Sequence, residues 1–424
     1  MTDTAGAAWE PKATYGPGTG ASPTGEGVVR RRRRWLRGVA LGAAVLVLGA
    51  GGAGWAAYQK LNGNITKDTD AAAELARYDR ERPAPLVHDA QNILLIGSDT
   101  RAGDNRKYGR DRGTQRSDTT ILLHLAADRQ SATAVSIPRD LMVDVPGCRR
   151  PDGSRTRAQF AQFNSAFEVG GTACTIRTVE KLTRIRVDHH MVVDFAGFKD
   201  MVDAVDGVEV CLKAPIDDED AHVRLAPGPQ TLDGEQALGY VRARKSLGTG
   251  SDTERMDRQQ EFLGALVNKV QSNDVLLNPS KLYPVLDAAT SSLTTDPALA
   301  SLRGLYELVR GMRDIPTERV QFLTVPRQSY TYDANRDELV EPAAEQLFTR
   351  LRTDSPVAVI PERARNPRES APSQDQAYRG DPDHSGSDDS EDSEDSDGKP
   401  DDPSHTPSPA PTFRGNTAAE AACE

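Results

Sequence analysis

The sequence lacks the short motifs that mark several common classes of enzyme. Its 424 residues contain no Gly-x-Ser-x-Gly nucleophile elbow and no P-loop, so a serine hydrolase or a nucleoside-triphosphate enzyme has no local support. The four cysteines and seven histidines show no spacing typical of a zinc site. No internal repeat stands out. The chemistry of a functional site must therefore be sought among carboxylates and arginines.

One apolar run is long enough to cross a membrane. Gly38–Tyr58 is a run of 21 residues without a charge, and a helix rising ~1.5 Å per residue would span a ~30 Å hydrocarbon layer. Arg30–Arg34 and Arg37 directly precede it, and such basic clusters stay on the cytoplasmic side. We predict a disordered cytoplasmic segment at residues 1–37, one transmembrane helix at 38–58 and an external remainder. A cleaved signal peptide is the alternative, although the run is longer than a usual signal core.

Composition divides the external remainder. Residues 59–90 are typical of a polar stalk with some helical character, and residues 91–357 alternate apolar strands with helical segments, as one α/β domain does. Residues 358–424 are rich in Ser, Asp, Glu and Pro, and we predict a disordered acidic tail. From Glu362 onward the tail holds 16 acidic and 6 basic residues, a net of −10 against −11 for the whole chain. The negative net charge of the chain therefore comes almost entirely from the tail. Helices are expected at Thr175–Thr183, Phe195–Val205, Gly234–Val241, Asp252–Gln271 and Ala298–Met312, and further strands at His190–Asp194, Val208–Leu212 and Val320–Val325.

Charged residues stand at the ends of three predicted strands. Asp99 follows the first apolar run, Asp118 precedes the second and Arg139 follows the third; the runs are Ile93–Ile96, Thr120–Leu125 and Ala132–Ile137. If these consecutive strands are antiparallel neighbours, the three side chains converge at one sheet edge. Carboxylates offer oxygens to a hard divalent cation, and arginines grip phosphate oxygens. Charges that merely keep strand ends soluble would explain any one of these residues better than all three together.

A second charged cluster opens a predicted helix. Ser251–Glu254 has the form of a capping box, so a helix should begin near Asp252. On that helix Arg255 and Gln259 continue the apolar, core-facing stripe. A charge that faces inward must be paired or must serve a ligand, because its desolvation alone is prohibitive.

Two arginines one residue apart precede this helix across a Gly-rich turn. Arg242 and Arg244 together with Arg255 could hold a polyphosphate. The alternative is an ion pair between Arg255 and Asp252, with the other two arginines on a solvated face.

Five ordered motifs resemble the LytR-CpsA-Psr family. They are NILLIGSDTR (92–101), RSDTT (116–120), SIPRD (136–140), FNSAFEVGG (163–171) and VRARKSLGTGSDTERMDRQQ (241–260), and the resemblance covers roughly residues 90 to 330. It implies a three-layer α-β-α domain with a central mixed sheet behind one transmembrane helix. It also implies an enzyme of the Gram-positive envelope that moves a glycopolymer from a polyprenyl-pyrophosphate carrier to peptidoglycan.

The resemblance further implies a role for each matching residue. Asp99 and Asp118 would hold Mg²⁺ or Mn²⁺, and the pyrophosphate would be gripped by Arg116, Arg139, Arg242, Arg244 and Arg255, which Asp252 and Gln259 order. Asp99, Asp118, Arg116 and Arg244 would form the catalytic set. The helix expected at Phe195–Val205 could line an apolar tunnel for the prenyl chain. No nucleotide and no nucleic acid is expected as a partner.

The favoured mechanism follows from charge. Attack by an acceptor sugar hydroxyl on the sugar-linked phosphorus builds negative charge that a metal ion and arginines can neutralise, and polyprenyl phosphate leaves. Three other readings stay open: a hydrolase of the lipid pyrophosphate that uses the same site, a non-catalytic binding or regulatory membrane protein, and a structural wall tether.

Cysteines outside the membrane can oxidise. Cys148 and Cys174 flank the FNSAF segment and are the candidates for a disulfide, which would stabilise the domain by about 3 kcal/mol in the chain-entropy model. Cys211 lies in an apolar strand and is predicted to be a buried thiol. Cys423 lies in the acidic tail and supports no prediction.

Overall fold

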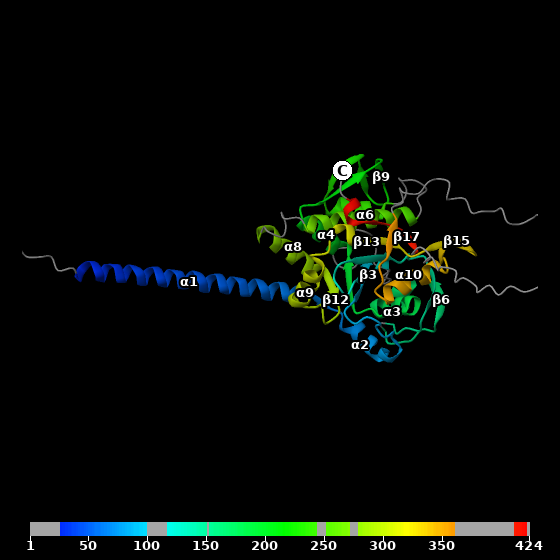
Figure 1. The fold of residues 1–424 in the computed structure, drawn as a ribbon, viewed down its shortest axis with the longest axis horizontal. Coiled ribbons are helices and arrows are strands. Elements are labelled where there is room, and N and C mark those ends of the chain that lie inside the picture. The colour runs from blue at the N-terminus through cyan, green and yellow to red at the C-terminus, as the bar shows by residue number, and fades with distance from the viewer. Residues whose placement is uncertain are drawn as a thin grey trace, which may run out of the picture. The chain divides into compact units, whose positions relative to one another are not determined.

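The computed structural model describes residues 26–99, 117–150, 152–243, 252–271, 279–360 and 411–421. The chain divides into two compact units, residues 1–59 and residues 60–424. The first is formed by most of α1 (Glu26–Asn64), a single helix of 39 residues (Figure 1). Within it Val39–Asn64 is long and apolar enough to cross a membrane, with a mean hydropathy of 1.8. The helix predicted at residues 38–58 is therefore present and continues to Asn64, but it begins at Glu26, so the prediction of disorder for residues 1–37 is wrong from Glu26 onward.

A mixed sheet of nine strands forms the centre of the second unit. Its strand order is β1-β12-β7-β2-β3-β4-β13-β17-β16. The strands are β1 (Thr66–Lys67), β2 (Gln91–Ser98), β3 (Ser117–Leu125), β4 (Ala132–Ser136), β7 (His189–Asp194), β12 (Leu293–Thr295), β13 (Val320–Thr324), β16 (Ala358–Ile360) and β17 (Thr412–Thr417). β3 runs antiparallel to both β2 and β4, as the sequence predicted, while β7 and β13 are parallel to β2 and β4, respectively.

Helices cover both faces of this sheet (Figure 1). Side chains alternate along each strand, so Leu94, Leu122 and Val135 pack on one face with α2 (Thr69–Arg77), α3 (Ser165–Thr183) and α10 (Ala343–Arg352). Ile93 and Ile121 pack on the other face with α6 (Asp252–Gln271) and α9 (Leu302–Met312). The expected three-layer α-β-α arrangement is confirmed. β2 is buried from both sides, which explains its unbroken apolar run.

The remaining elements extend these layers. A third apolar cluster joins α6 to α4 (Phe195–Ala204), α5 (Gly234–Arg242) and the small hairpins beside them. The other described elements are α8 (Pro279–Ser292), the 3-10 turns η1 (Asp79–Glu81), η3 (Thr317–Arg319) and η6 (Ala418–Ala421), and the strand pairs β5 (Met142–Val145) with β6 (Gln159–Gln162), β8 (Val208–Leu212) with β11 (Gly228–Leu232), β9 (Ile216–Asp218) with β10 (Val223–Leu225), and β14 (Arg327–Tyr330) with β15 (Asp333–Leu339).

Two expected helices differ in where they begin. α9 starts at Leu302 and not at Ala298, because the Ser301 hydroxyl caps it by accepting from the backbone N–H of Gly304 at 3.0 Å. α3 starts ten residues earlier than expected and is interrupted inside by Gly170 and Gly171. Gly171 has φ of +59°, a conformation that favours glycine, and this break hid the first part of the helix from the periodic pattern.

Residues 59–90 do not form a separate stalk. Ala71 and Leu75 of α2 are buried in the main core, and β1 joins the central sheet. Arg82 forms a buried ion pair with Glu180 of α3 at 2.7 Å. The charged and polar character of this segment comes from its outer face, which the composition alone could not separate from a solvated stalk.

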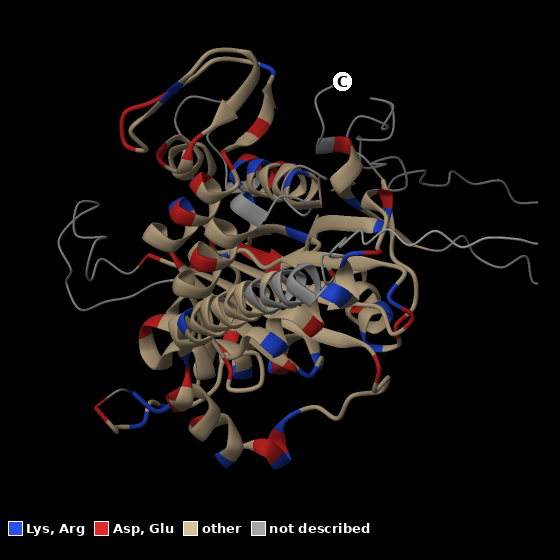
Figure 2. Cartoon of the chain, turned by 90° about the vertical axis from the view of Figure 1, so that its left-hand side faces the viewer, with Lys and Arg blue, Asp and Glu red and all other residues tan. Residues whose placement is uncertain are grey.

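The acidic tail returns to the fold at its end, so the prediction of disorder for residues 358–424 is wrong at the residues that form β16 and β17. β17 lies between β13 and β16 in the central sheet, and Phe413 is only 6% exposed. The sequence of this strand, TFRGNT, contains one large apolar residue, so it has no detectable strand pattern. Acidic and basic residues are interspersed over the described domain (Figure 2). Residues 361–410 lie outside the described part of the chain.

The cysteines give one confirmation and one correction. Cys148 and Cys174 form a disulfide with a Cα–Cα distance of 5.7 Å, and both lie in the main core. Cys211 is not a buried thiol: it is exposed and disulfide-bonded. Alternation along β8 places its neighbours Val210 and Leu212 inward, which puts Cys211 on the outer face.

Candidate active site at one edge of the sheet

The strand directions gather five chain segments at one edge of the sheet. This edge is formed by the ends of strands and not by an outer strand. Ser98, the last residue of β2, pairs with Ser117 at the start of β3 and with Asp194 at the end of β7. Ser136 at the end of β4 pairs with Thr324 at the end of β13. The carboxyl ends of four strands and the start of a fifth therefore lie together.

Asp118 and Arg139 meet at this edge, as the sequence predicted. Arg139 Nη1 donates to Asp118 Oδ1 at 2.8 Å, and Arg139 Nε donates to Asp140 Oδ2 at 3.2 Å. Asp140 Oδ1 in turn accepts from Gln162 Nε2 at 2.5 Å. Asp99 directly follows Ser98 and is half-buried at the same edge. Three carboxylates and a doubly anchored guanidinium are thus placed where three segments join.

The end of α5 reaches the same edge from the β7 side. Asp194 caps α4 by accepting from the N–H of Gly197 at 2.9 Å, which fixes Phe195 directly after β7. The guanidinium of Arg242, the last residue of α5, lies 4.7 Å from the centre of the Phe195 ring. This cation-π contact holds Arg242 at the sheet edge.

The first turns of α6 attach the end of α5 to the sheet. Gln259 Nε2 donates to the carbonyl of Val241 at 3.2 Å, and Arg258 Nη2 donates to the carbonyl of Ala243. Gln260 Nε2 donates to Ser136 Oγ at 3.1 Å and to Thr324 Oγ1 at 3.0 Å, so this part of α6 lies against the ends of β4 and β13.

Buried positive charge accompanies these contacts. Arg255 and Arg258 are only 5% and 7% exposed. Burial lowers the pKa of Arg258, while the phenol of Tyr240 and the carboxylate of Glu254 act in the opposite direction. The fold thus holds two guanidinium groups in poor contact with water, where each gains from an anionic partner.

Some predicted site residues cannot be compared with the structure. Arg116 and Arg244 lie outside the described residues, as does the side chain of Asp252, so its proposed ion pair with Arg255 is not tested. The sequence analysis overlooked Asp140, Arg258 and Gln260. Arg258 could have been found, because it lies three residues after Arg255 and therefore shares its helix face.

The carboxylates can be compared with the needs of a metal ion. Within the described ranges, no group of three or more His, Cys, Asp or Glu side chains is placed to hold a metal. Magnesium usually takes one or two carboxylates and completes its octahedron with water and substrate phosphates. The ion pair with Arg139 uses Oδ1 of Asp118, and that side chain is 34% exposed. Two carboxylates at this edge, Asp99 and Asp118, match the number and type of protein ligand that such an ion uses.

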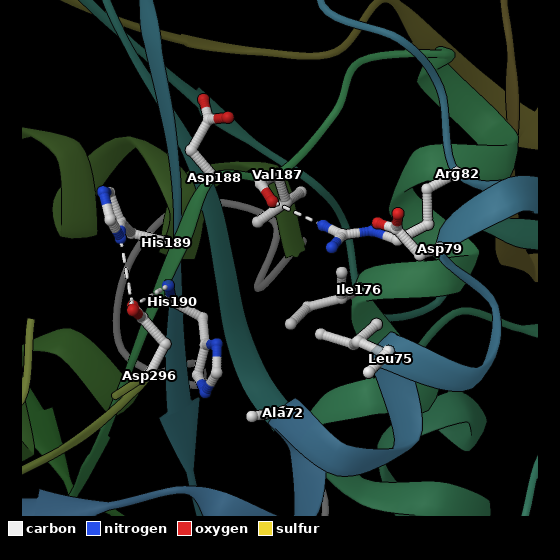
Figure 3. Close-up of a pocket in the computed structure, with 11 residues that line it drawn as sticks. Ala72, Leu75, Asp79, Arg82, Ile176, Val187, Asp188, His189, His190 and Asp296 are labelled. Atoms are coloured by element: carbon white, nitrogen blue, oxygen red, sulfur yellow. Dashed lines mark hydrogen bonds and ion pairs between the residues drawn. The ribbon is translucent and has the colours of Figure 1, made fainter. Parts of the chain in front are cut away.

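A cavity of about 410 Å³ lies at the opposite edge of the sheet (Figure 3). It is bordered by the first residues of β7, by α2 and by Asp296. His189 contacts Asp296 at 3.3 Å, and His190 lies 3.4 Å from Asp68. Because β7 begins here and ends at Asp194, this cavity is separate from the site around Asp118 and Arg139.

Comparison with known proteins gives matches along most of the domain. The model of the LytR_cpsA_psr family matches residues 58–353. The probable cell wall biosynthesis protein LcpB of Corynebacterium glutamicum is 36% identical over 293 residues, which cover 66% of this chain and 66% of LcpB. The polyisoprenyl-teichoic acid–peptidoglycan teichoic acid transferase TagT of Bacillus subtilis is 31% identical over 330 residues, which cover 74% of this chain and 94% of TagT. The crystal structure of protein gbs0355 from Streptococcus agalactiae has a TM-score of 0.52 at 22% identity and covers 64% of this chain and 92% of that one, which supports the fold alone.

Proposed function

The chain belongs to the LytR-CpsA-Psr family, and on this basis we propose that it is a membrane-anchored phosphotransferase. It moves a glycopolymer from a polyprenyl-pyrophosphate carrier to peptidoglycan, as the name of TagT states for that relative with teichoic acid. The observation that carries the proposal is the meeting of Asp118 and Arg139 at 2.8 Å on the sheet edge that also receives Arg242. This is a site for a polyanion with a cation.

The arginines bind and orient the donor. Arg139, held between Asp118 and Asp140, directs its positive charge to phosphate oxygens, and Arg242 does so from the β7 side. Arg116, Arg244 and Arg255 are assigned the same task, with Asp252 and Gln259 as their supports. Gln259 is suited to this because it binds the carbonyl of Val241, next to Arg242.

A divalent cation, Mg²⁺ or Mn²⁺, would be held by Asp99 and Asp118 and would supply neutralising charge next to the pyrophosphate. The acceptor hydroxyl oxygen forms a bond to the sugar-linked phosphorus, the bond from that phosphorus to polyprenyl phosphate breaks, and the hydroxyl proton passes to the departing phosphate. The buried guanidinium group of Arg255 stabilises the negative charge that develops on the phosphoryl oxygens, because it acts where water is scarce. The product is a phosphodiester between glycopolymer and wall.

The apolar helix places the site beside its lipid donor. We propose that α1 is a single-pass anchor with a cytoplasmic N-terminus, because the arginine cluster precedes the apolar window Val39–Asn64. The domain then faces the wall, and attachment to the same bilayer raises the local concentration of the donor.

Replacement of the two paired residues tests this proposal. Arg139→Ala and Asp118→Asn should each lower transfer from a synthetic polyprenyl-pyrophosphate-linked glycan to peptidoglycan by about a hundredfold, the usual effect of losing one contact to a developing charge. Arg139→Lys should also transfer little, because an ammonium group cannot contact Asp118 and Asp140 through two edges as the guanidinium group does. Product is measured by mass spectrometry with and without acceptor, which separates transfer from hydrolysis.

Arg303→Ala on α9 is the matched control. Arg303 also pairs with a carboxylate, Glu307, but it lies on an exposed helix face and should leave transfer unchanged. Melting temperatures are recorded for every variant. Full transfer by a stably folded Arg139→Ala protein would contradict the proposed site, and products formed only with water would show a hydrolase.

A further inference from the structure

Three aromatic side chains gather at the surface on two neighbouring hairpins. Phe160 of β6 lies 6.1 Å from Tyr330 of β14, and Tyr330 lies 5.4 Å from Tyr332 in the turn before β15, as ring-centre distances. We call Phe160, Tyr330 and Tyr332 the aromatic ledge. Phe160 is 55% exposed and Tyr332 is 86% exposed, in a chain with only 5% aromatic residues. Packing of the domain does not account for rings left in water.

The aromatic ledge is anchored to the candidate active site. Arg336 of β15 lies 3.9 Å from Asp140, which binds Arg139 at 3.2 Å. The backbone N–H of Asp337 donates to the carbonyl of Asp140 at 3.1 Å, and the Asp337 carboxylate pairs with Arg327. These contacts fix the hairpin β14–β15 to the segment that carries Arg139.

The surroundings of the rings are polar. Glu338 accepts hydrogen bonds from Gln328 at 2.9 Å and from Thr331 at 3.0 Å, and all three groups lie on the hairpin that carries Tyr330 and Tyr332. Flat apolar rings bordered by exposed hydrogen-bonding groups match a sugar ring, whose C–H face is apolar and whose rim is hydroxylated. A prenyl chain would instead require an enclosed apolar groove.

We propose that the aromatic ledge binds the glycan strand of the acceptor peptidoglycan and presents its hydroxyl to the site at Arg139. This inference rests on the proposed function. The donor is held by its pyrophosphate and its lipid, whereas the acceptor is a long, cross-linked polymer that cannot enter a closed cavity. An open surface next to the reacting phosphate suits such an acceptor.

Binding measured without any donor tests the inference. The full-length chain in detergent is sedimented with purified insoluble peptidoglycan, and Tyr332→Ala and Phe160→Ala should each weaken binding about fivefold. Tyr306→Ala is the matched control, because Tyr306 is 63% exposed but lies on α9, and it should bind as the parent does. In transfer assays the two ledge variants should raise the KM for peptidoglycan and leave kcat and the KM for donor unchanged.

Tyr332→Trp provides a second, direct measurement. The three tryptophans of the chain are Trp9, Trp35 and Trp55, so the described domain beyond residue 60 has none of its own. The new indole keeps a ring at position 332, should retain binding, and should change its fluorescence on addition of soluble peptidoglycan glycan oligomers.

The outcomes separate this inference from the proposed function. Unchanged binding of peptidoglycan and an unchanged KM for the acceptor in both alanine variants would contradict the proposed role of the aromatic ledge. The proposed transferase function would not be affected by that result. A fluorescence response to the donor's glycan but not to peptidoglycan oligomers would overturn the assignment to the acceptor. A parent chain that binds peptidoglycan through the ledge and transfers nothing would instead refute the proposed function.

Discussion

Buried polar groups are concentrated at the first turns of α6. Arg258 and Gln260 are both buried, and each satisfies a hydrogen-bonding group that belongs to another element. Removal of such a partner leaves a buried donor or acceptor unpaired, which costs about 1 to 3 kcal/mol. These residues therefore position the end of α5 and the ends of β4 and β13 relative to each other, although neither is assigned to substrate.

Two carboxylates at the opposite edge should make the fold sensitive to acid. Burial acts to raise the pKa of Asp68 and of Asp296, but the nearby imidazoles of His190 and His189, respectively, and hydrogen bonds from backbone N–H groups outweigh it and leave both below the ordinary value of 3.8. A carboxyl with a lower pKa in the folded state contributes stability that is complete above the unfolded pKa and disappears as pH falls through the folded pKa.

From these two groups we expect a free energy of unfolding that is flat between about pH 8 and pH 5 and falls below about pH 4. Asp296→Asn should reduce the steepness of that fall and should cost about 1 kcal/mol at neutral pH, because one of its hydrogen bonds is lost. Urea unfolding at a series of pH values measures both effects. Identical pH dependence in the variant and the parent would contradict the assignment.

The positions of Asp118 and Arg139 were predictable because strand ends follow from apolar runs and short turns. The role of Arg258 was not, since a hydrogen bond to a carbonyl such as that of Ala243 leaves no trace in a sequence. The aromatic ledge was hidden for a related reason: Phe160 and Tyr330 are 170 positions apart and meet only because β6 and β14 follow neighbouring strands.

At the scale of elements, the strand β17 is the least predictable part of the fold. It pairs antiparallel with β13 and parallel with β16, so backbone hydrogen bonds hold a sequence with little strand propensity. A Cβ added at Gly415 would lie 2.1 Å from the carbonyl oxygen of Phe322, so the close approach of the two strands also requires glycine.

Phe413→Ala should lower the free energy of unfolding by about 3 to 4 kcal/mol, the usual cost of a buried phenylalanine. Phe160→Ala removes the same atoms from an exposed position and should change stability by less than about 0.5 kcal/mol. Chemical unfolding of the two variants gives the comparison. Equal losses would show that β17 is not a structural part of the sheet.

At the scale of the whole molecule, the proposed topology gives a simple expectation. A reporter that is active only outside the cytoplasm should work when fused after Gln91 and should fail when fused at residue 25, because the arginine cluster keeps its side of α1 in the cytoplasm. Activity is measured in cells at matched expression. The reverse pattern would place the domain in the cytoplasm, away from the lipid donor and the wall, and would contradict the proposed topology.

The short connection between α1 and the domain limits how far the domain can lie from the end of the helix. α1 ends at Asn64, and β1, which belongs to the central sheet, begins at Thr66. A single residue, Ile65, therefore joins the helix to the sheet. One residue adds at most ~3.5 Å of reach. A domain of this size is roughly 50 Å across. On the proposed topology and function, the acceptor hydroxyl must lie within about that height of the bilayer, so the innermost layer of the wall is the part within reach.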